Sequence, residues 1–159
     1  MNIFDDYTIK LLVALNQDAI EYIIVGGYAV NFHGYRRTTG DIDIWIKPDN
    51  DTKAKIIVVL RKLGVKENIL EELKGMDFTK PLVFIDGEEP YKIDFMTYVS
   101  GVKFEDAWPK RILAKLDNIS VPFIQFNQLI LTKISSNRLK DKADVEELQR
   151  IQQLRNKTD

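Results

Sequence analysis

Asp41 and Asp43 alternate with three isoleucines, Ile42, Ile44 and Ile46, in the stretch of this sequence that best suits metal chemistry. Successive side chains on a β-strand point to opposite faces, so the two carboxylates are predicted to share one face and the isoleucines the other. Two carboxylates this close repel each other unless a cation or hydrogen-bond donors hold them together. Because Mg²⁺ prefers oxygen ligands, we expect Mg²⁺ at this pair, with Mn²⁺ as the alternative.

A third carboxylate, Asp94, lies among apolar residues in segment 91–98, a predicted strand with Lys92 and Asp94 on one face. Three carboxylates suit two-metal phosphoryl transfer, in which cations activate a hydroxyl and stabilise the leaving pyrophosphate. We expect Asp41 and Asp43 to hold both metals, and Asp94 to complete the catalytic one and accept the hydroxyl proton. The structural alternative is that Asp41 and Asp43 belong to a charged edge strand, and that Asp94 is a structural aspartate whose hydrogen bonds are satisfied within the fold.

Gly26 and Gly27 separate a predicted strand, 21–25, from a predicted helix, 28–34. Glycines at such a position can simply permit a sharp turn. They can also let a phosphate approach the backbone N–H groups at the start of a helix. Asp41 follows Gly26 by 15 residues (41 − 26), so the turn and the paired carboxylates can lie at the same end of adjacent strands.

Composition narrows the classes of protein that this chain can represent. Its 159 residues fit a single domain with a substantial core. With no cysteine, disulfides and thiolate metal sites are excluded, and one histidine, His33, excludes a multi-histidine zinc site. No apolar run is long enough for a membrane helix, and we expect a cytoplasmic protein. The balance of 23 basic and 24 acidic residues neither favours nor excludes a nucleic-acid partner.

Hydrophobic periodicity and turn residues predict the elements that must position these side chains. Helices are predicted at 5–16, 28–34, 51–63, 125–136 and 140–154. Strands are predicted at 21–25, 41–47, 81–85 and 91–98, and in two extended stretches of 111–124. Segment 68–76 is either a short helix or a connector.

Two hairpin turns are expected, at Asp86-Gly87 and at Asp117-Asn118. The order of elements predicts an α/β (α+β) domain with a small mixed β-sheet flanked by helices. We expect one domain over 1–159, with a core of about 18–124 and C-terminal helices over about 125–155.

The motifs V-G-G-x-A-V-x-x-H-G at 25–34 and R-x-T-x-D-I-D-I at 37–44, followed by Asp94 in KIDF, resemble the polymerase-β-type nucleotidyltransferase superfamily. The motif K-x-x-x-x-R-x-K-D-x-x-D at 133–144 is similar to the helical tail of small stand-alone bacterial members. These include lincosamide nucleotidyltransferases and the minimal nucleotidyltransferases of toxin–antitoxin and abortive-infection systems. The resemblance implies the nucleotidyltransferase fold and Mg²⁺-dependent transfer of a nucleoside monophosphate from an NTP, such as ATP, to an acceptor.

The common first motif of this superfamily is Gly-Ser, whose hydroxyl is aimed at the phosphates, and Gly27 replaces that serine here. The triphosphate must then be held by backbone N–H groups and by basic side chains. Arg37 and Lys133 are the candidate clamps, since Arg gives bidentate donors and Lys a point charge. Thr39 is expected to hydrogen-bond the backbone ahead of the carboxylates.

Other polar and aromatic residues receive structural interpretations. The tail residues Arg138, Lys140, Asp141 and Asp144 are expected to form an ion-paired helix start rather than contact substrate. We expect His33 to bond a loop carbonyl, with a role as a base as the alternative, and Tyr28 to pack, with stacking on a nucleotide base as the alternative. Arg36 and Lys47 are expected to be solvated, and Trp45 and Trp108 to pack. On the last helix, the residues expected to face inward are Ala143, Val145, Leu148 and Ile151.

Two other functions compete with an active transferase. The first is a catalytically silent module of the same fold that binds an NTP or a protein partner, as in a toxin–antitoxin pair. The second is a sugar transferase, which would use Asp-x-Asp alone and needs neither Gly26-Gly27 nor Asp94. The hydroxyl acceptor is left open between a small molecule, a protein and RNA, and a homodimer or partner chain could complete the pocket.

Overall fold

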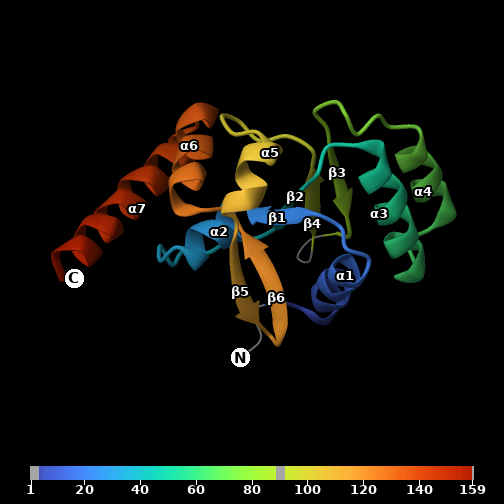
Figure 1. Cartoon of the computed structure of the whole chain (residues 1–159), viewed down its shortest axis with the longest axis horizontal. Helices are drawn as coiled ribbons and strands as arrows, with labels where there is room; N and C mark the ends of the chain where they lie inside the picture. Colours follow the sequence, from blue (N-terminus) through green and yellow to red (C-terminus); the bar gives the residue numbers. More distant parts are fainter. Residues whose placement is uncertain (1–3, 89–91, 159) are drawn as a thin grey trace.

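The computed structural model describes residues 4–88 and 92–158, which include a six-stranded mixed sheet in the order β3-β4-β2-β1-β6-β5 (Figure 1). The pairs β1/β6 and β2/β4 are parallel, and the remaining neighbours are antiparallel. The strands are β1 (Tyr22–Val25), β2 (Ile42–Ile46), β3 (Val83–Asp86), β4 (Ile93–Met96), β5 (Ile112–Leu116) and β6 (Ile119–Phe123). The predicted α/β class with a small mixed sheet and flanking helices is therefore confirmed.

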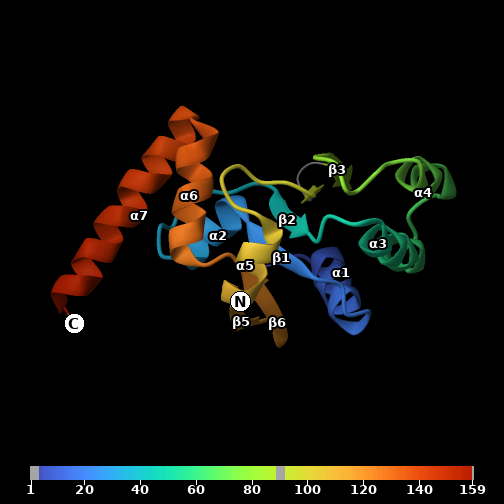
Figure 2. The ribbon, with the colours of Figure 1, turned by 45° about the horizontal axis from the view of Figure 1, so that its top comes forward.

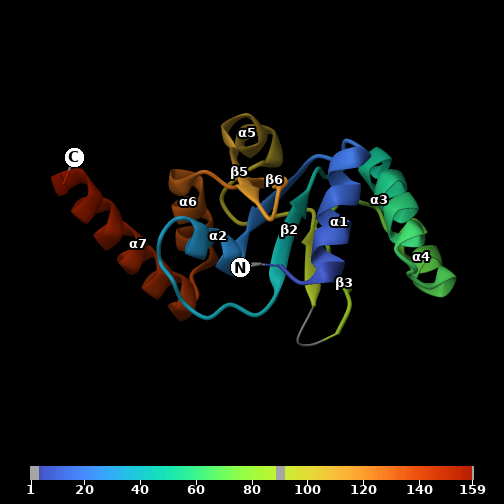
Figure 3. The ribbon, with the colours of Figure 1, turned by 90° about the horizontal axis from the view of Figure 1, so that it is seen from below.

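Helices flank the sheet at both ends: α1, α3 and α4 lie together on one side, and α6 and α7 on the other (Figures 1 and 2). Seen from below, α7 extends away from the sheet toward the C-terminus (Figure 3). The helices are α1 (Asp6–Gln17), α2 (Gly26–Phe32), α3 (Asn50–Lys62), α4 (Glu67–Lys74), α5 (Phe104–Ala107), the 3-10 helix η1 (Trp108–Lys110), α6 (Phe126–Ser136) and α7 (Leu139–Thr158). Among the described residues, no helix has the length and apolar character needed to cross a bilayer.

Aspartate side chains fix where α1 and α3 begin. The Asp5 carboxylate accepts a hydrogen bond from the Thr8 backbone N–H at 2.9 Å, and Asp49 accepts one from Thr52 at 2.7 Å. Each bond satisfies an N–H group that has no partner within its own helix.

The two faces of β2 differ as the sequence predicted. Ile42, Ile44 and Ile46 are buried in the hydrophobic core, while Asp43 and Trp45 lie on the opposite face. Trp45 is also buried, because Phe104 of α5 covers its ring edge-on at a centroid distance of 5.2 Å. Sequence reasoning did not predict α5 or η1, whose few residues are too short for a periodic pattern.

The hairpin predictions had mixed outcomes. Asp117 and Asn118 both have positive φ, at 50° and 64°, which confirms the tight turn between β5 and β6. β3 and β4 pair antiparallel as expected, but Asp86 still belongs to β3, where it pairs with Ile93. The prediction of a two-residue turn at Asp86-Gly87 is therefore wrong, because the connection spans 87–92; Tyr91, the predicted start of the partner strand, lies outside the described residues.

Two predictions about helices are also settled. The ambiguous segment 68–76 is mostly helical, in α4. Ala143 of α7 was expected to face inward but is exposed. The buried residues near the start of that helix are instead Asp141 and Asp144, followed by Leu148. The face of α7 that packs inward is thus partly acidic, because α6 supplies a buried cation.

Candidate functional site

The three predicted carboxylates meet at one edge of the sheet. Asp43 of β2 and Asp94 of β4 are direct partners in the parallel pair of strands. Asp41 lies in a bend just before β2, so it is outside the strand in which it was predicted. All three carboxylates line one cavity of about 350 Å³, which we call the carboxylate cavity.

All eight residues predicted for the site line the carboxylate cavity, and their roles remain predictions. The parallel pairing of β2 with β4 brings the carboxylates together, while the β1–α2 turn, the loop before β2 and helix α6 supply the remaining residues. The eight are Gly26, Gly27, Arg37, Thr39, Asp41, Asp43, Asp94 and Lys133.

The carboxylates strongly influence one another. Burial, followed by the charges of Asp94 and Asp41, raises the pKa of Asp43 to about 6, while Lys133 opposes the rise. Burial and the Asp41 charge also raise the pKa of Asp94, although Lys92 acts in the opposite direction. The cluster therefore favours either a proton or a cation among its oxygens.

Lys92 supplies positive charge to this cluster. Its Nζ lies 3.0 Å from Oδ2 of Asp41 and 3.9 Å from Oδ1 of Asp94. The sequence pattern predicts Lys92 and Asp94 on the same strand face but indicates no role for Lys92. Lys92 stands two residues before Asp94, a candidate metal ligand, and this spacing could have indicated its contact with the carboxylates.

The oxygen atoms at the site suit a hard divalent cation. Oδ1 of Asp41 and Oδ1 of Asp94 are buried and have no hydrogen-bond partner within the described part of the chain, and buried polar atoms of this kind are rare. Carboxylate oxygens are the ligands that Mg²⁺ prefers. Within 4–88 and 92–158, however, no three His, Cys, Asp or Glu side chains already form a metal-binding group.

The two glycines let the backbone approach the carboxylates. Gly26 has φ +67°, and a Cβ atom there would overlap Oδ2 of Asp43. A Cβ atom at Gly27 would overlap Oγ1 of Thr39. The Thr39 hydroxyl thus occupies the space beside Gly27 that a serine side chain at that position would enter.

The two candidate phosphate clamps are held by an acid on α7. Arg37 donates to both carboxylate oxygens of Asp144, from Nε at 2.8 Å and from Nη2 at 3.0 Å. The buried Nζ of Lys133 lies 3.0 Å from Asp141 and 3.1 Å from Asp144. The pairs fix both cations at the wall of the cavity and offset the cost of burying Lys133.

The start of α7 is ion-paired, as predicted. Asp141 accepts hydrogen bonds from Lys133, from the Ser136 hydroxyl and from Nε of Arg138. Burial alone would raise the pKa of Asp141, but these three bonds lower it. Arg138 and Lys140 also line the carboxylate cavity, which the structural interpretation of these two residues did not anticipate.

A second hollow, which we call the apolar cleft, adjoins the carboxylate cavity. Both are lined by Gly26, Asp43, Asp94, Lys133 and Arg138. The apolar cleft adds the side chains of Val83, Met96, Tyr98 and Val99. A ligand could therefore place a charged group in the cavity and a less polar group in the cleft.

The remaining aromatic and imidazole predictions concern structure. Nε2 of His33 lies 2.7 Å from the carbonyl oxygen of Ile124, and burial lowers the pKa of the imidazole. This is the expected bond to a loop carbonyl. Tyr28 stacks on Phe4 at a centroid distance of 5.7 Å, in keeping with a packing role.

Several solved structures share this fold. The lincosamide antibiotic adenylyltransferase LnuA, bound to lincomycin, is 15% identical, with a TM-score of 0.54, over 94% of this chain and 98% of that chain. The antibiotic-resistance factor ANT(2'')-Ia is 13% identical, with a TM-score of 0.52, over 96% and 92%. An antigenic nucleotidyltransferase-like protein from Paracoccidioides brasiliensis is 14% identical, with a TM-score of 0.51, over 89% and 72%.

The sequence itself determines the family. No curated protein matches the chain. Residues 3–157 match the family model described as "Nucleotidyltransferase of unknown function (DUF6036)", which covers nearly the whole chain. The protein therefore belongs to this nucleotidyltransferase family and is an enzyme of the nucleotidyltransferase class.

Proposed function

We propose that this protein transfers a nucleoside monophosphate from an NTP to a hydroxyl acceptor with the help of Mg²⁺ or Mn²⁺. The acceptor oxygen forms a bond to the α-phosphorus, the bond from that phosphorus to pyrophosphate breaks, and the hydroxyl proton leaves. The products are the nucleotidylated acceptor, pyrophosphate and a proton.

The observation that carries this proposal is the composition of the carboxylate cavity. Three aspartates face four basic residues there, Arg37, Lys133, Arg138 and Lys140, beside two glycines without side chains. The acids suit a divalent cation, and the basic residues suit a triphosphate. A metal–nucleotide complex would satisfy the acids and the basic residues together.

The chain's own groups have separable roles in this proposal. Asp41, Asp43 and Asp94 hold the metal, whose chemistry is to activate the hydroxyl and to neutralise charge on pyrophosphate. In the same proposal Asp94 accepts the proton of the acceptor hydroxyl. Arg138 and Lys140 bind the triphosphate together with the backbone at Gly26 and Gly27.

Arg37 and Lys133 act from the wall of the cavity in the same proposal. Each is held by an α7 carboxylate, so each is fixed before the substrate arrives. Fixed charges of this kind stabilise developing phosphate charge without reorganisation. The Thr39 hydroxyl beside Gly27 supplies the hydrogen bond that a serine provides in Gly-Ser relatives.

A transfer assay tests the proposal directly. Purified protein, α-labelled NTPs, Mg²⁺ and a panel of hydroxyl compounds should yield a labelled acceptor. Asp43→Asn should abolish transfer, and Asp94→Asn should slow it by about 10²-fold to 10⁴-fold. Asp51→Asn, an exposed change on α3, is the matched control and should retain full activity. Unchanged transfer in Asp43→Asn would sink the mechanism.

A second candidate is a silent module that binds an NTP or a protein partner without turnover. Its support is that Lys92 already pairs with Asp41, and that Asp144 already pairs with Arg37 and Lys133. Under this alternative, nucleotide binds but no hydroxyl in the panel is labelled, and Lys92→Ala leaves that result unchanged. Labelling of any acceptor excludes this alternative.

A further inference from the structure

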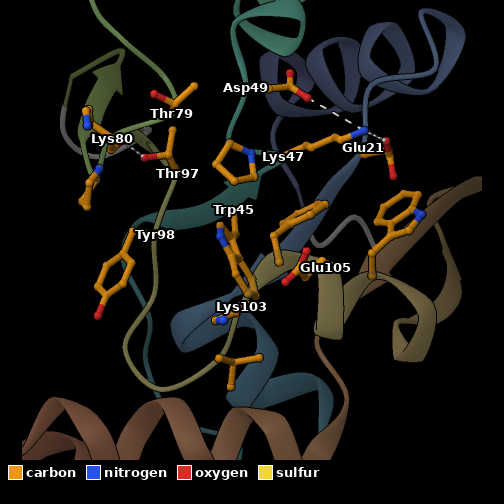
Figure 4. Close-up of a pocket in the computed structure, with 15 residues that line it drawn as sticks. Glu21, Trp45, Lys47, Asp49, Thr79, Lys80, Thr97, Tyr98, Lys103 and Glu105 are labelled. Atoms are coloured by element: carbon orange, nitrogen blue, oxygen red, sulfur yellow. Dashed lines mark hydrogen bonds and ion pairs between the residues drawn. The ribbon is translucent and has the colours of Figure 1, made fainter.

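Another, larger pocket lies beside the sheet and is separate from the carboxylate cavity and the apolar cleft. It has a volume of about 620 Å³, and we call it the tryptophan pocket. Trp45, Phe104 and Trp108 form its aromatic wall, with ring centroids 5.2 Å apart for the first pair and 5.8 Å for the second. Figure 4 shows the Trp45 indole near the centre of the lining residues, between Tyr98 and Glu105.

The tryptophan pocket follows the carboxylates along the same face of the sheet. Asp43 pairs with Asp94, and the next pair on that face is Trp45 with Met96. Neighbours on one strand face are about 7 Å apart along the strand. Tyr98, which follows the end of β4, lines both the apolar cleft and the tryptophan pocket. A single elongated molecule could therefore lie in the pocket and reach Asp94.

One wall of the tryptophan pocket carries an unsatisfied donor. Trp45 is 1% exposed, and its Nε1 has no hydrogen-bond partner among the described residues. A buried indole N–H usually has a partner, and leaving one unpaired is costly. The missing group is a hydrogen-bond acceptor, which a ligand in this pocket can provide by displacing the groups that cover Nε1.

The charged residues around the tryptophan pocket do not favour a charged ligand. Three lysines, Lys47, Lys80 and Lys103, are matched by three acids, Glu21, Asp49 and Glu105. Lys47 is also neutralised by ion pairs with Glu21 at 3.1 Å and with Asp49 at 3.8 Å. Binding in this pocket therefore depends on the apolar surface that the ligand buries and on one hydrogen bond. A strongly cationic or anionic molecule gains little electrostatic binding energy there.

We propose that the tryptophan pocket holds the ring-bearing body of a neutral small-molecule acceptor whose hydroxyl reaches Asp94. This rests on the proposed transferase function. β4 ends at Met96, and the chain from Asp94 to Tyr98 spans at most about 13 Å, which sets the length of an acceptor that can reach both residues. In the reaction, the acceptor oxygen bonds to the α-phosphorus, pyrophosphate leaves, and the hydroxyl proton passes to Asp94.

The natural fluorescence of the protein makes this testable without catalysis. The chain contains two tryptophans, and both line the pocket. The probe is 4-nitrophenyl β-D-glucopyranoside, a neutral compound with an aromatic ring and several hydroxyls that quenches tryptophan. We expect saturable quenching in the wild type, and no saturable quenching by the polycation tobramycin.

Two variants locate the binding. Trp45→Phe keeps a ring but removes the N–H, and should weaken binding of the glucoside by about fivefold to tenfold, as seen through Trp108. Val102→Phe adds a ring at another lining residue of the pocket and should abolish saturable quenching. It also provides a test should Trp45→Phe fail to fold.

Three results would overturn this inference: the glucoside causes no saturable quenching, tobramycin quenches saturably, or Val102→Phe binds the glucoside as the wild type does. Each can occur while the Mg²⁺–NTP complex still binds the carboxylate cavity. Failure of the acceptor site is thus separable from failure of the transferase proposal, which nucleotide binding measures independently.

Discussion

The electrostatic environment of Asp43 links its chemistry to stability. Burial and two neighbouring carboxylates raise its pKa from 3.8 to about 6 in the folded protein. Between these values the folded state binds more protons than the unfolded state. The free energy of unfolding of the metal-free protein therefore falls as pH rises through this window, and the penalty is complete above about pH 6.

Asp43→Asn should remove this dependence. The stability of the variant relative to the wild type should grow between about pH 4 and 6, by at most about 3 kcal/mol. Urea unfolding in the presence of a chelator, compared across this range, measures the difference. Asp51→Asn is the control. A difference that does not vary with pH would contradict the account of the site.

The space beside Gly27 gives a second test at single residues. Gly27→Ala should cost about 1–3 kcal/mol of stability, because its Cβ would overlap the Thr39 hydroxyl. Gly40→Ala is the matched control, since nothing lies within 4 Å of a Cβ atom there, and should change stability by less than about 0.5 kcal/mol. Thermal unfolding measures both.

A double variant checks the cause. Adding Thr39→Ala to Gly27→Ala removes the overlapping oxygen and should restore part of the lost stability. If the double variant is as unstable as the sum of the two single variants, the overlap is not the reason.

At the level of single residues, the sequence predicted the acidic residues of the site but not the basic residues that pair with them. Alternation in the predicted strand 41–47 identified Asp41 and Asp43, and an acid in an apolar strand identified Asp94. The ion pair between Lys92 and Asp41 depends on how β4 pairs with β2, which spacing along one strand does not determine. The same is true of Arg37 and Asp144, which are 107 residues apart.

Among the elements, α6 and α7 show why periodicity of apolar residues alone missed the buried acids and wrongly included Ala143. Prediction of buried positions relied on apolar residues, and so selected Ala143 on α7. The residues actually buried are Asp141, Asp144 and Leu148, at helical spacing but with two acids. One sequence feature could have indicated the buried acids. Lys133 is the single basic residue of α6, and it lies on the face that also carries Leu129 and Ile130.

The junction of these helices should be sensitive to one carboxylate. Asp144→Asn leaves Arg37 and the buried Lys133 without part of their charge balance and should cost about 3–5 kcal/mol of stability. Urea unfolding measures the loss. Glu147→Gln on the same helix removes an exposed pair with Arg150 and should cost less than about 1 kcal/mol. Equal effects of the two changes would contradict a structural role for Asp144 at the site.

For the whole molecule, the element order was sufficient to predict a mixed sheet with helices around it. The order of strands in that sheet was not predicted, because it depends on long-range pairing. The parallel contact of β2 with β4 is the decisive one, since it brings Asp43 beside Asp94 across 51 residues (94 − 43). The short helices α5 and η1 were also not predicted, although Phe104 of α5 covers Trp45 and Trp108 of η1 stacks on Phe104.

The central claim is that the carboxylate cavity binds a metal–NTP complex. Isothermal titration calorimetry with the α,β-methylene analogues of ATP, GTP, CTP and UTP tests it without knowledge of the acceptor. At least one analogue should bind with Mg²⁺ and lose affinity in a chelator. Asp43→Asn and Asp94→Asn should weaken that binding by about tenfold or more, whereas Asp51→Asn should not. Binding that is independent of Mg²⁺ and unchanged in both aspartate variants, or no binding of any analogue, would contradict the claim.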